Sequence, residues 1–188
     1  MSILDALPDA SATRLANARA ALASAAQVDE SRLLPARLRY AGSLYAAVGD
    51  AVERQRARRP PVVIISGGYG LVTAEEPIGT YDRRFAIADW PKGLLHECLE
   101  ALVTDGVQRV LAFCAATTPY AELIRRARWR AMGVQATLVS PSMAGHGGAQ
   151  VLVPRALGEA FASAVAGNLT TAWTSSDGVG LVVEDVAR

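Results

Sequence analysis

Cysteine is scarce in this sequence of 188 residues, which contains only Cys98 and Cys114. The two form no CxxC motif and have no Cys or His neighbour at metal-ligand spacing, so neither a disulfide framework nor a zinc site is indicated. Both fall in segments that we expect to be buried. The simpler interpretation is two small apolar side chains in a reducing compartment, with no metal and no cofactor.

An excess of charge is also missing, since 19 Lys and Arg residues face 18 Asp and Glu residues. Nothing in this balance demands a polyanionic partner. We interpret the basic run from Arg54 to Arg59 as a solvated helix end whose cations offset the helix dipole, rather than as a nucleic-acid patch. The N-terminus has no basic leader with a long apolar segment, and no apolar run is long enough to cross a bilayer. These absences predict a cytoplasmic protein without a membrane partner.

Several widespread catalytic and phosphate-binding motifs are absent as well. The sequence has no GxGxxG after its first strand-like segment and no Gly-Lys-Ser/Thr loop, so the common phosphate-binding fingerprints fail. A GxSxG elbow and an HExxH helix are missing too. Serine hydrolase and zincin activities therefore lose their best support.

Strand-like and helix-like segments alternate along the chain. This pattern favours a single α/β domain over residues 1–188, with a mainly parallel sheet flanked by helices on both faces. We expect an N-terminal helical extension at residues 1–30 that contains an Ala-rich helix, a central strand from Val62 to Ser66, and an edge strand at 179–183. Two further strands are expected at residues 110–114 and 135–140, and helices at 43–56, 90–103, 121–131 and 153–165.

The stretch after the central strand is the first place to look for function. Ser66 is followed by Gly67, Gly68, Tyr69 and Gly70, and glycines let the backbone turn sharply and approach a ligand closely. In open α/β sheets, ligands lie outside the carboxyl ends of the strands. We therefore expect this turn to border a binding site.

Two other segments carry candidate site residues with competing interpretations. Arg37 and Tyr40 precede a helix for which Ser43 is a plausible N-cap, a place that suits an anion, although arginines are more often solvated. Tyr81 and Asp82 could contact a ligand, with Asp82 as a general base. From spacing alone, packing for Tyr81 and a turn or ion pair for Asp82 are favoured.

Two later loops are weaker candidates. Thr117 or Thr118 precedes Pro119 as an N-cap precedes a first-turn proline, and the loop could also hold an anion. His146 lies among glycines and could act as an acid or base, but no partner for it can be named and a solvated histidine is the simpler interpretation.

Two of these blocks, taken together, resemble the YaaA-like families, which include peroxide stress proteins. The similarity rests on Pro35 to Arg37, Tyr40, Gly42 to Tyr45, then Ser66 to Val72, Glu76 to Ile78, and Tyr81-Asp82. The resemblance covers about the middle third of the chain. The lysine-bearing first strand of many relatives is replaced here by the Ala-rich helix, and no helix-hairpin-helix consensus is present.

The resemblance implies an α/β fold with a polar cleft and a link to nucleic acid, iron homeostasis or modified bases. Carried over residue by residue, it gives Arg37, Ser66 and Asp82 as catalytic candidates. The ligand-binding candidates are Tyr40, Ser43, Gly67, Gly68, Tyr69, Gly70, Tyr81 and Thr117. We expect a pocket for a small anionic or planar ligand, such as a nucleotide or modified base, in an enzyme of nucleotide or specialised metabolism. The alternative is a DNA-binding protein of the oxidative stress response.

Overall fold

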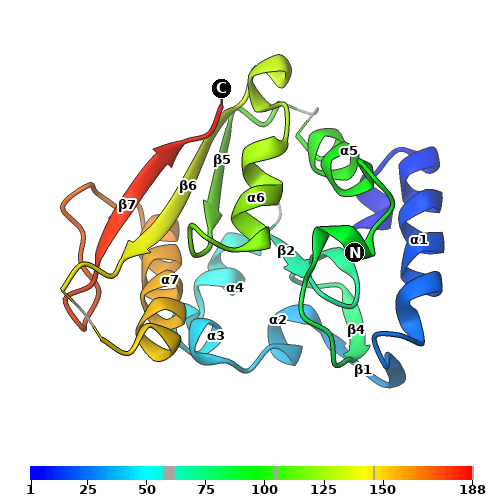
Figure 1. Ribbon diagram of the computed structural model, residues 1–188, viewed down its shortest axis with the longest axis horizontal. Coiled ribbons are helices and arrows are strands. Elements are labelled where there is room, and N and C mark those ends of the chain that lie inside the picture. The colour runs from blue at the N-terminus through cyan, green and yellow to red at the C-terminus, as the bar shows by residue number, and fades with distance from the viewer. Residues whose placement is uncertain (57–61, 104–105, 146, 188) are drawn as a thin grey trace.

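The computed structural model describes residues 1–56, 62–103, 106–145 and 147–187. Within these ranges the strands form three small sheets. One joins β1 (Asp29–Pro35) to β4 (Pro77–Thr80), and another joins β2 (Val63–Ser66) to β3 (Gly70–Thr73). The third contains β5 (Arg109–Phe113), β6 (Gln135–Ser142) and β7 (Gly180–Asp185). Figure 1 shows the three-stranded sheet on one side of the molecule and the two smaller sheets on the other.

The expected mixture of helices and strands is confirmed, but the prediction of a mainly parallel sheet is wrong. In the described residues only β5 and β6 pair in parallel, whereas β1–β4, β2–β3 and β6–β7 are antiparallel. The supposed central strand β2 pairs with β3 alone. Its residues Val63 to Ile65 are only partly buried, although Val63 and Ile65 pack against the main core and Ile64 packs against two smaller apolar clusters.

The glycine turn explains why β2 cannot lead into a parallel partner. Ser66 pairs with Gly70, so that Gly67, Gly68 and Tyr69 form a three-residue hairpin loop. Gly70 has a φ of +72°, the left-handed conformation that such loops require at their end. A parallel pair needs a crossover of a dozen or more residues, which this loop does not supply. The residues after the turn, for which the sequence predicted no regular element, contain the strands β3 and β4.

Helices cover both faces of the three-stranded sheet. On β5, Ala112 packs toward the main core, whereas Phe113 lies against Phe161 of α7 (Ala149–Val165) with ring centroids 5.5 Å apart. The core on the opposite face contains residues of α5 (Leu94–Ala101) and α6 (Pro119–Arg126). Adjacent residues of a strand point to opposite faces, so an apolar run buried on both sides follows.

Helix boundaries differ from the expected ones where glycine or a short turn intervenes. The predicted helix after Gly42 is split at Gly49, whose φ is +56°, into α3 (Ser43–Val48) and α4 (Ala51–Arg56). Ser43 is the first helical residue and makes no capping hydrogen bond, because Gly42 is the N-cap. The helix predicted to reach residue 131 ends at Arg126, and the 3-10 helix η3 (Trp129–Met132) follows. The short elements η1 (Leu4–Ala6), α2 (Ala36–Arg39) and η2 (Ile87–Asp89) complete the fold.

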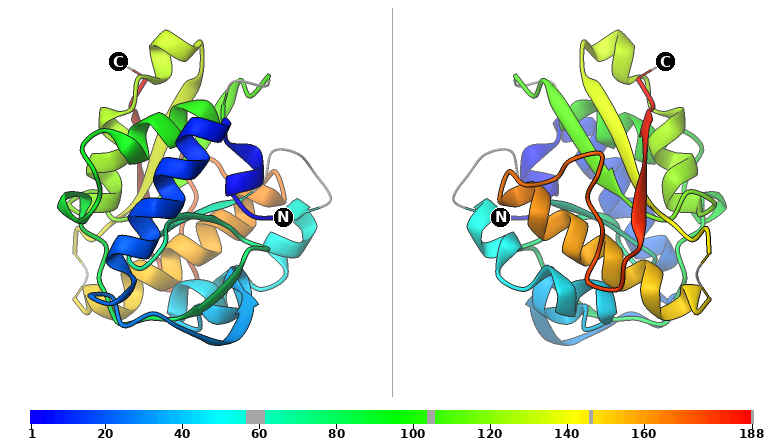
Figure 2. Two further views of the ribbon diagram at one scale, coloured as in Figure 1. Left: turned by 90° about the vertical axis from the view of Figure 1, so that its right-hand side faces the viewer. Right: turned by 90° about the vertical axis from the view of Figure 1, so that its left-hand side faces the viewer.

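The Ala-rich helix α1 (Asp9–Ala23) forms one outer layer of the molecule, and α7 with β7 lies on the opposite side (Figure 2). From α1, Arg19 reaches the hairpin: its Nε donates to the carbonyl of Tyr69 at 2.9 Å, and its Nη1 contacts Glu76 Oε1 at 2.7 Å. Glu76 also accepts from the backbone N–H of Ile3 at 2.7 Å and of Thr73 at 3.3 Å. The buried pair of Arg19 and Glu76 thus fastens the N-terminal segment to the glycine turn.

Within the described ranges no helix combines the length and apolar character needed to span a membrane. The described segments also contain no cluster of three or more His, Cys, Asp or Glu side chains that could hold a metal ion. His146 and residues 57–61, which include part of the basic run, lie outside the described residues.

Candidate functional site

The glycine turn is in close contact with the segment that follows β4. A Cβ added to Gly67 would lie 2.1 Å from the carbonyl oxygen of Arg83, and one added to Gly68 would lie 2.6 Å from the ring of Tyr81. Any side chain at these positions would displace the 81–84 segment. The absence of side chains at the two glycines therefore lets the 81–84 segment pack directly on the backbone of the turn. The ring of Tyr81 fills the space next to it.

Three hydroxyl groups meet at this contact. Ser66 Oγ lies 3.1 Å from the hydroxyl of Tyr81, which lies 3.1 Å from the hydroxyl of Tyr40. The backbone N–H of Tyr69 donates to Ser66 Oγ at 3.2 Å. A backbone N–H can only donate, so this bond fixes one end of a hydrogen-bonded chain that runs from the turn to Tyr40.

The aromatic rings around these hydroxyls pack on one another. Tyr40 stacks on Tyr45 of α3, with centroids 5.0 Å apart and an interplanar angle of 22°. Tyr81 meets both Tyr40 and Tyr69 edge to face, at 6.3 Å and 5.9 Å. These are the geometries that aromatic quadrupoles favour. The expected convergence of Tyr40, Ser66, Tyr69 and Tyr81 is present in the structure.

Tyr69 has its own polar partners. Its hydroxyl donates to Glu30 Oε1 at 3.1 Å and accepts from the backbone N–H of Gly79 at 3.0 Å. The guanidinium carbon of Arg19 lies 5.7 Å from the centroid of the ring. Tyr69 therefore ties the glycine turn to β1, β4 and α1.

Two tyrosines that the sequence did not suggest as site residues belong to the same group. Tyr120, in the first turn of α6, stacks on Phe85 at a centroid distance of 5.0 Å. Burial raises the pKa of Tyr45, and the neighbouring phenols of Tyr81 and Tyr120 add to that rise. All five tyrosines of the chain thus gather in one place, which we call the tyrosine cluster: Tyr40, Tyr45, Tyr69, Tyr81 and Tyr120.

Hydrogen-bonding capacity remains at the edge of the tyrosine cluster. In the described part of the chain, the hydroxyls of Tyr45 and Tyr120 have no hydrogen-bond partner. Burial also raises the pKa of Tyr40 and of Tyr120, so these phenols are protonated at neutral pH and can donate. The sequence did carry a signal for these hydroxyls, because Tyr45 and Tyr120 are tyrosine where phenylalanine would fill almost the same volume.

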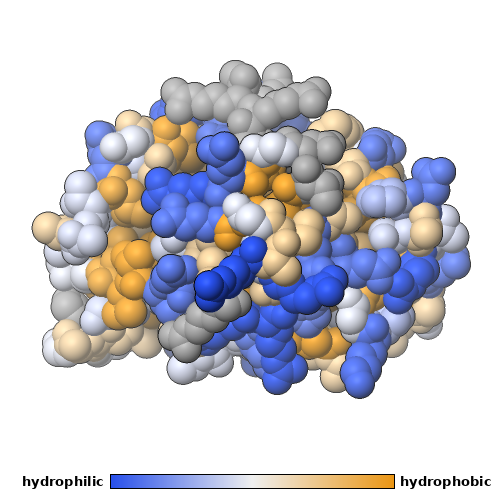
Figure 3. Space-filling model, turned by 90° about the horizontal axis from the view of Figure 1, so that it is seen from above, coloured by the Kyte–Doolittle hydropathy of each residue, from blue (hydrophilic) through white to orange (hydrophobic). Residues whose placement is uncertain are grey.

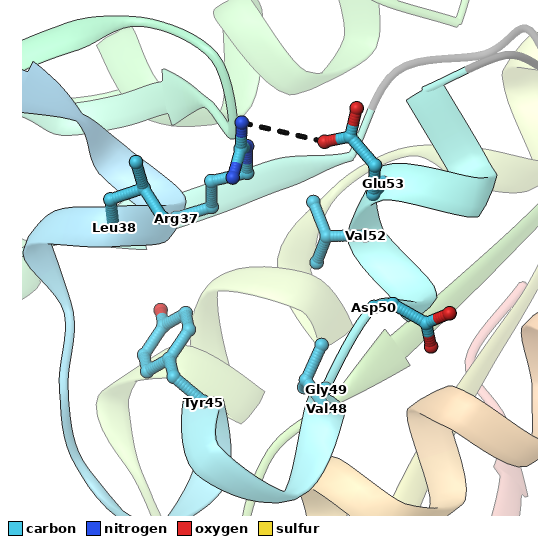
Figure 4. Close-up of a pocket in the computed structure, with 8 residues that line it drawn as sticks. All are labelled: Arg37, Leu38, Tyr45, Val48, Gly49, Asp50, Val52 and Glu53. Atoms are coloured by element: carbon cyan, nitrogen blue, oxygen red, sulfur yellow. Dashed lines mark ion pairs between the residues drawn. The ribbon is translucent and has the colours of Figure 1, made fainter.

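An open hollow of about 530 Å³ lies beside the cluster, between α2, α3 and α4. Tyr45 and Arg37 line one side of the hollow, and Val48 and Val52 line the other (Figure 4). The volume is in the range of small-molecule sites. Because Tyr45 also stacks on Tyr40, the hollow and the tyrosine cluster share a wall.

Arg37 is not available as a free cation in this hollow. Its Nε lies 2.6 Å from Glu75 Oε1, and its Nη2 lies 3.4 Å from Glu53 Oε2. The dashed line in Figure 4 marks the second of these ion pairs. Arg37 thus lies near Tyr40 as expected, but the carboxylates of Glu75 and Glu53 already balance its charge.

Asp82 is placed differently from the tyrosines. Exposure alternates from Tyr81 to Phe85: Tyr81 and Arg83 are half-buried and Phe85 is buried, whereas Asp82 and Arg84 are exposed. The backbone N–H of Asp82 donates to the carbonyl of Ala26 at 2.9 Å. The carboxylate of Asp82 therefore lies on the solvent side of the segment whose other side packs on the turn.

The remaining sequence candidates lie at the margins of the site. Thr117 and Ser43 are exposed. Thr118 is the N-cap of α6, as predicted, and its Oγ1 accepts from the backbone N–H of Ala121 at 3.4 Å. The Cβ of a residue replacing Gly70 would lie 3.0 Å from the ring of Trp90.

Comparison of the chain with family models, with curated proteins and with solved structures found no match.

Proposed function

We propose that this protein binds a small planar ligand of the nucleobase class at the tyrosine cluster and the adjoining hollow. One observation carries the proposal: Tyr40, Tyr69 and Tyr81 converge on the glycine turn, and Tyr45, which stacks on Tyr40, forms a wall of the hollow. Aromatic side chains stack on planar rings, and phenol hydroxyls can both donate to and accept from the polar edge of a base. The resemblance to the YaaA-like families supports the same class of ligand.

A chemical step on that ligand is the expectation that comes with the resemblance. Ser66 is buried and its hydroxyl contacts Tyr81 and the backbone N–H of Tyr69, so in the described residues no histidine or carboxylate contacts it as a general base. These contacts support a positioning role for Ser66. They favour binding as the primary function.

The alternative, DNA binding, gains little from the charged surface. Three arginines of α6 and the residues just after it are paired within the molecule, Arg125 with Glu184, Arg126 with Glu122 and Arg128 with Glu100, whereas Arg130 is exposed. On the face seen from above in Figure 3, hydrophobic residues interrupt the hydrophilic ones. The ion pairs of Arg125, Arg126 and Arg128 leave these guanidinium groups less available to a phosphate backbone.

The proposal is tested by thermal unfolding with the common nucleobases and nucleosides, each at about 100 times its dissociation constant. A ligand of the site is expected to raise Tm by about 5–10 °C. The variant Tyr45→Ala removes the shared wall and is expected to abolish the shift. Trp173→Ala, which removes an aromatic ring far from the turn in the sequence, serves as the matched control and keeps it. No shift with any base or nucleoside would contradict the proposal.

A further inference from the structure

The tyrosine cluster is a neutral environment that disfavours negative charge. Where Tyr40, Tyr81 and Ser66 meet, its polar groups are neutral hydroxyls, and the charged contacts with Glu30 and Arg19 lie at its edge, on Tyr69. Burial is the main cause of the raised pKa of Tyr40, Tyr45 and Tyr120, which means that a phenolate there is poorly solvated. The same desolvation acts on any anion that enters without a cation to meet it.

Most guanidinium groups around the cluster are engaged by carboxylates of the protein; Arg39 instead donates to the backbone carbonyls of Arg32 and Ile78 and does not line the hollow. Arg37 is paired with Glu75 and Glu53, and Arg83 binds Asp89 through two hydrogen bonds of 2.8 Å and 2.6 Å. Arg19 is paired with Glu76. Arg84 is exposed on the outer side of its segment, as Asp82 is. The described residues therefore direct no uncompensated positive charge into the hollow.

Carboxylates also border the site. Glu30 accepts from Tyr69 at one edge of the cluster, and Asp50 and Glu53, which pair with Arg54 and Arg37, line the hollow at the other. By contrast, the free hydroxyls of Tyr45 and Tyr120 suit neutral carbonyl oxygens, amides and ring nitrogens. Groups of this kind form the edge of a nucleobase.

We propose that the site takes a neutral base or nucleoside and discriminates against the corresponding nucleotide, because Arg37 is held by Glu75 and Glu53 and cannot serve a phosphate. This inference rests on the proposed function and narrows it. The expectation of an anion at Arg37, drawn from its place before a helix, is thereby replaced by selection for an uncharged ligand.

The experiment is calorimetric titration of the full chain with adenosine, guanosine, uridine and cytidine, each beside its 5′-monophosphate at fixed ionic strength. For the nucleoside that binds, we expect an affinity about tenfold or more above that of its monophosphate. Glu75→Gln releases Arg37 from its closest partner and is expected to bring the two affinities within about threefold of each other. Glu53→Gln, which removes the longer contact, should move the ratio in the same direction by a smaller factor.

Glu97→Gln is the matched control, because Glu97 pairs with Arg14 on α1, outside the hollow, and its removal should leave the ratio unchanged. Tighter binding of the monophosphate by the unmodified protein would overturn this inference while leaving the proposed function intact. An unchanged ratio in folded Glu75→Gln and Glu53→Gln variants would overturn it too. Failure of both nucleosides and monophosphates to bind would overturn the proposed function, and the inference with it.

Discussion

The three-stranded sheet and the glycine-turn region are held together by different forces. In the sheet, β5 and β6 pair in register over five residues from Arg109↔Gln135 to Phe113↔Val139, and apolar side chains alternate between two helical layers. Around the glycine turn, short strand pairs are joined by polar side chains that are distant in sequence. Tyr81 meets Tyr40 across 41 positions, and Arg19 meets Glu76 across 57.

This difference bears on where the proposed binding site lies. In the sheet, the ladder pairs the backbone polar groups and the apolar side chains pack on the helices. The glycine-turn region instead collects hydroxyl and aromatic groups whose positions depend on one another, and only Tyr120 comes from the sheet half. Perturbing the polar contacts should therefore affect this region far more than the sheet.

The largest expected effect comes from alkaline pH. Tyr40 and Tyr45 have raised pKa values in the folded protein, so above pH 10 the folded state binds more protons than the unfolded state. Their contribution is fully present below pH 10, and the two groups together remove about 3 kcal/mol of the free energy of unfolding per pH unit above it. Urea unfolding at pH 8, 10 and 12 measures this loss, to which Tyr120 and the buried thiols of Cys98 and Cys114, whose pKa values are also raised, contribute as well. Tyr45→Phe should reduce the loss by about 1.4 kcal/mol per pH unit. Tyrosinate absorbance near pH 10 that is present in the folded unmodified protein and lost in folded Tyr45→Phe would contradict the prediction.

Breaking the buried ion pair should have the next largest effect. Arg19→Ala leaves Glu76 buried without its cation and is expected to cost about 3–5 kcal/mol of the free energy of unfolding. In the sheet half, Arg125→Ala removes a pair in which both side chains are about one-third exposed, and it should cost about 0–1 kcal/mol. Chemical denaturation of the two variants compares them directly. Equal losses would show that the two halves do not differ in this way.

A smaller effect is expected from filling the turn. Gly67→Ala forces the Cβ against the carbonyl of Arg83 and should cost about 1–3 kcal/mol, together with loss of ligand binding as Tyr81 moves. Gly42→Ala is the control, because nothing lies within 4 Å of its added Cβ. That variant should stay within about 0.5 kcal/mol of the unmodified protein. Wild-type stability in Gly67→Ala would mean that the 81–84 segment does not pack on the turn.

The smallest effect belongs to the sheet half. Thr118→Ala removes the N-cap of α6 and is expected to cost about 1 kcal/mol without changing ligand affinity. Thr118→Ser keeps the capping oxygen and should recover most of the stability. A loss of binding in a folded Thr118→Ala variant would show that the site reaches farther into α6 than the contacts of Tyr120 indicate.

Sequence patterns predicted the sheet half better than the turn region, for a physical reason. The strands at 110–114 and 135–140, the edge strand near 179–183 and the cap at Thr118 all follow from local periodicity and capping chemistry, and the structure confirms them. The pairing of β2 depends on the geometry of a three-residue turn, which a glycine-rich segment does not specify uniquely. The split at Gly49 and the strands β3 and β4 were missed for the same reason.

The candidate site shows the same division. The resemblance indicated Tyr40, Ser66, Tyr69 and Tyr81 as site residues, but not Tyr45 and Tyr120. The aromatic partners of these two are known only from the positions of α3 and α6 in the structure. The ion pairs of Arg37 likewise involve Glu53 and Glu75, which lie 16 and 38 positions away. No spacing rule links these residues.

By itself the sequence determined most of the helices and the strands of the three-stranded sheet, since propensity, periodicity and caps are local properties of the chain; it did not indicate β1, β3 or β4. It also determined that a glycine turn follows Ser66. The tertiary structure decided which strands pair, which faces become buried, and that five phenols gather beside an arginine already neutralised. Those outcomes depend on contacts between residues tens of positions apart, and such contacts stabilise the protein only once folding has brought the residues together.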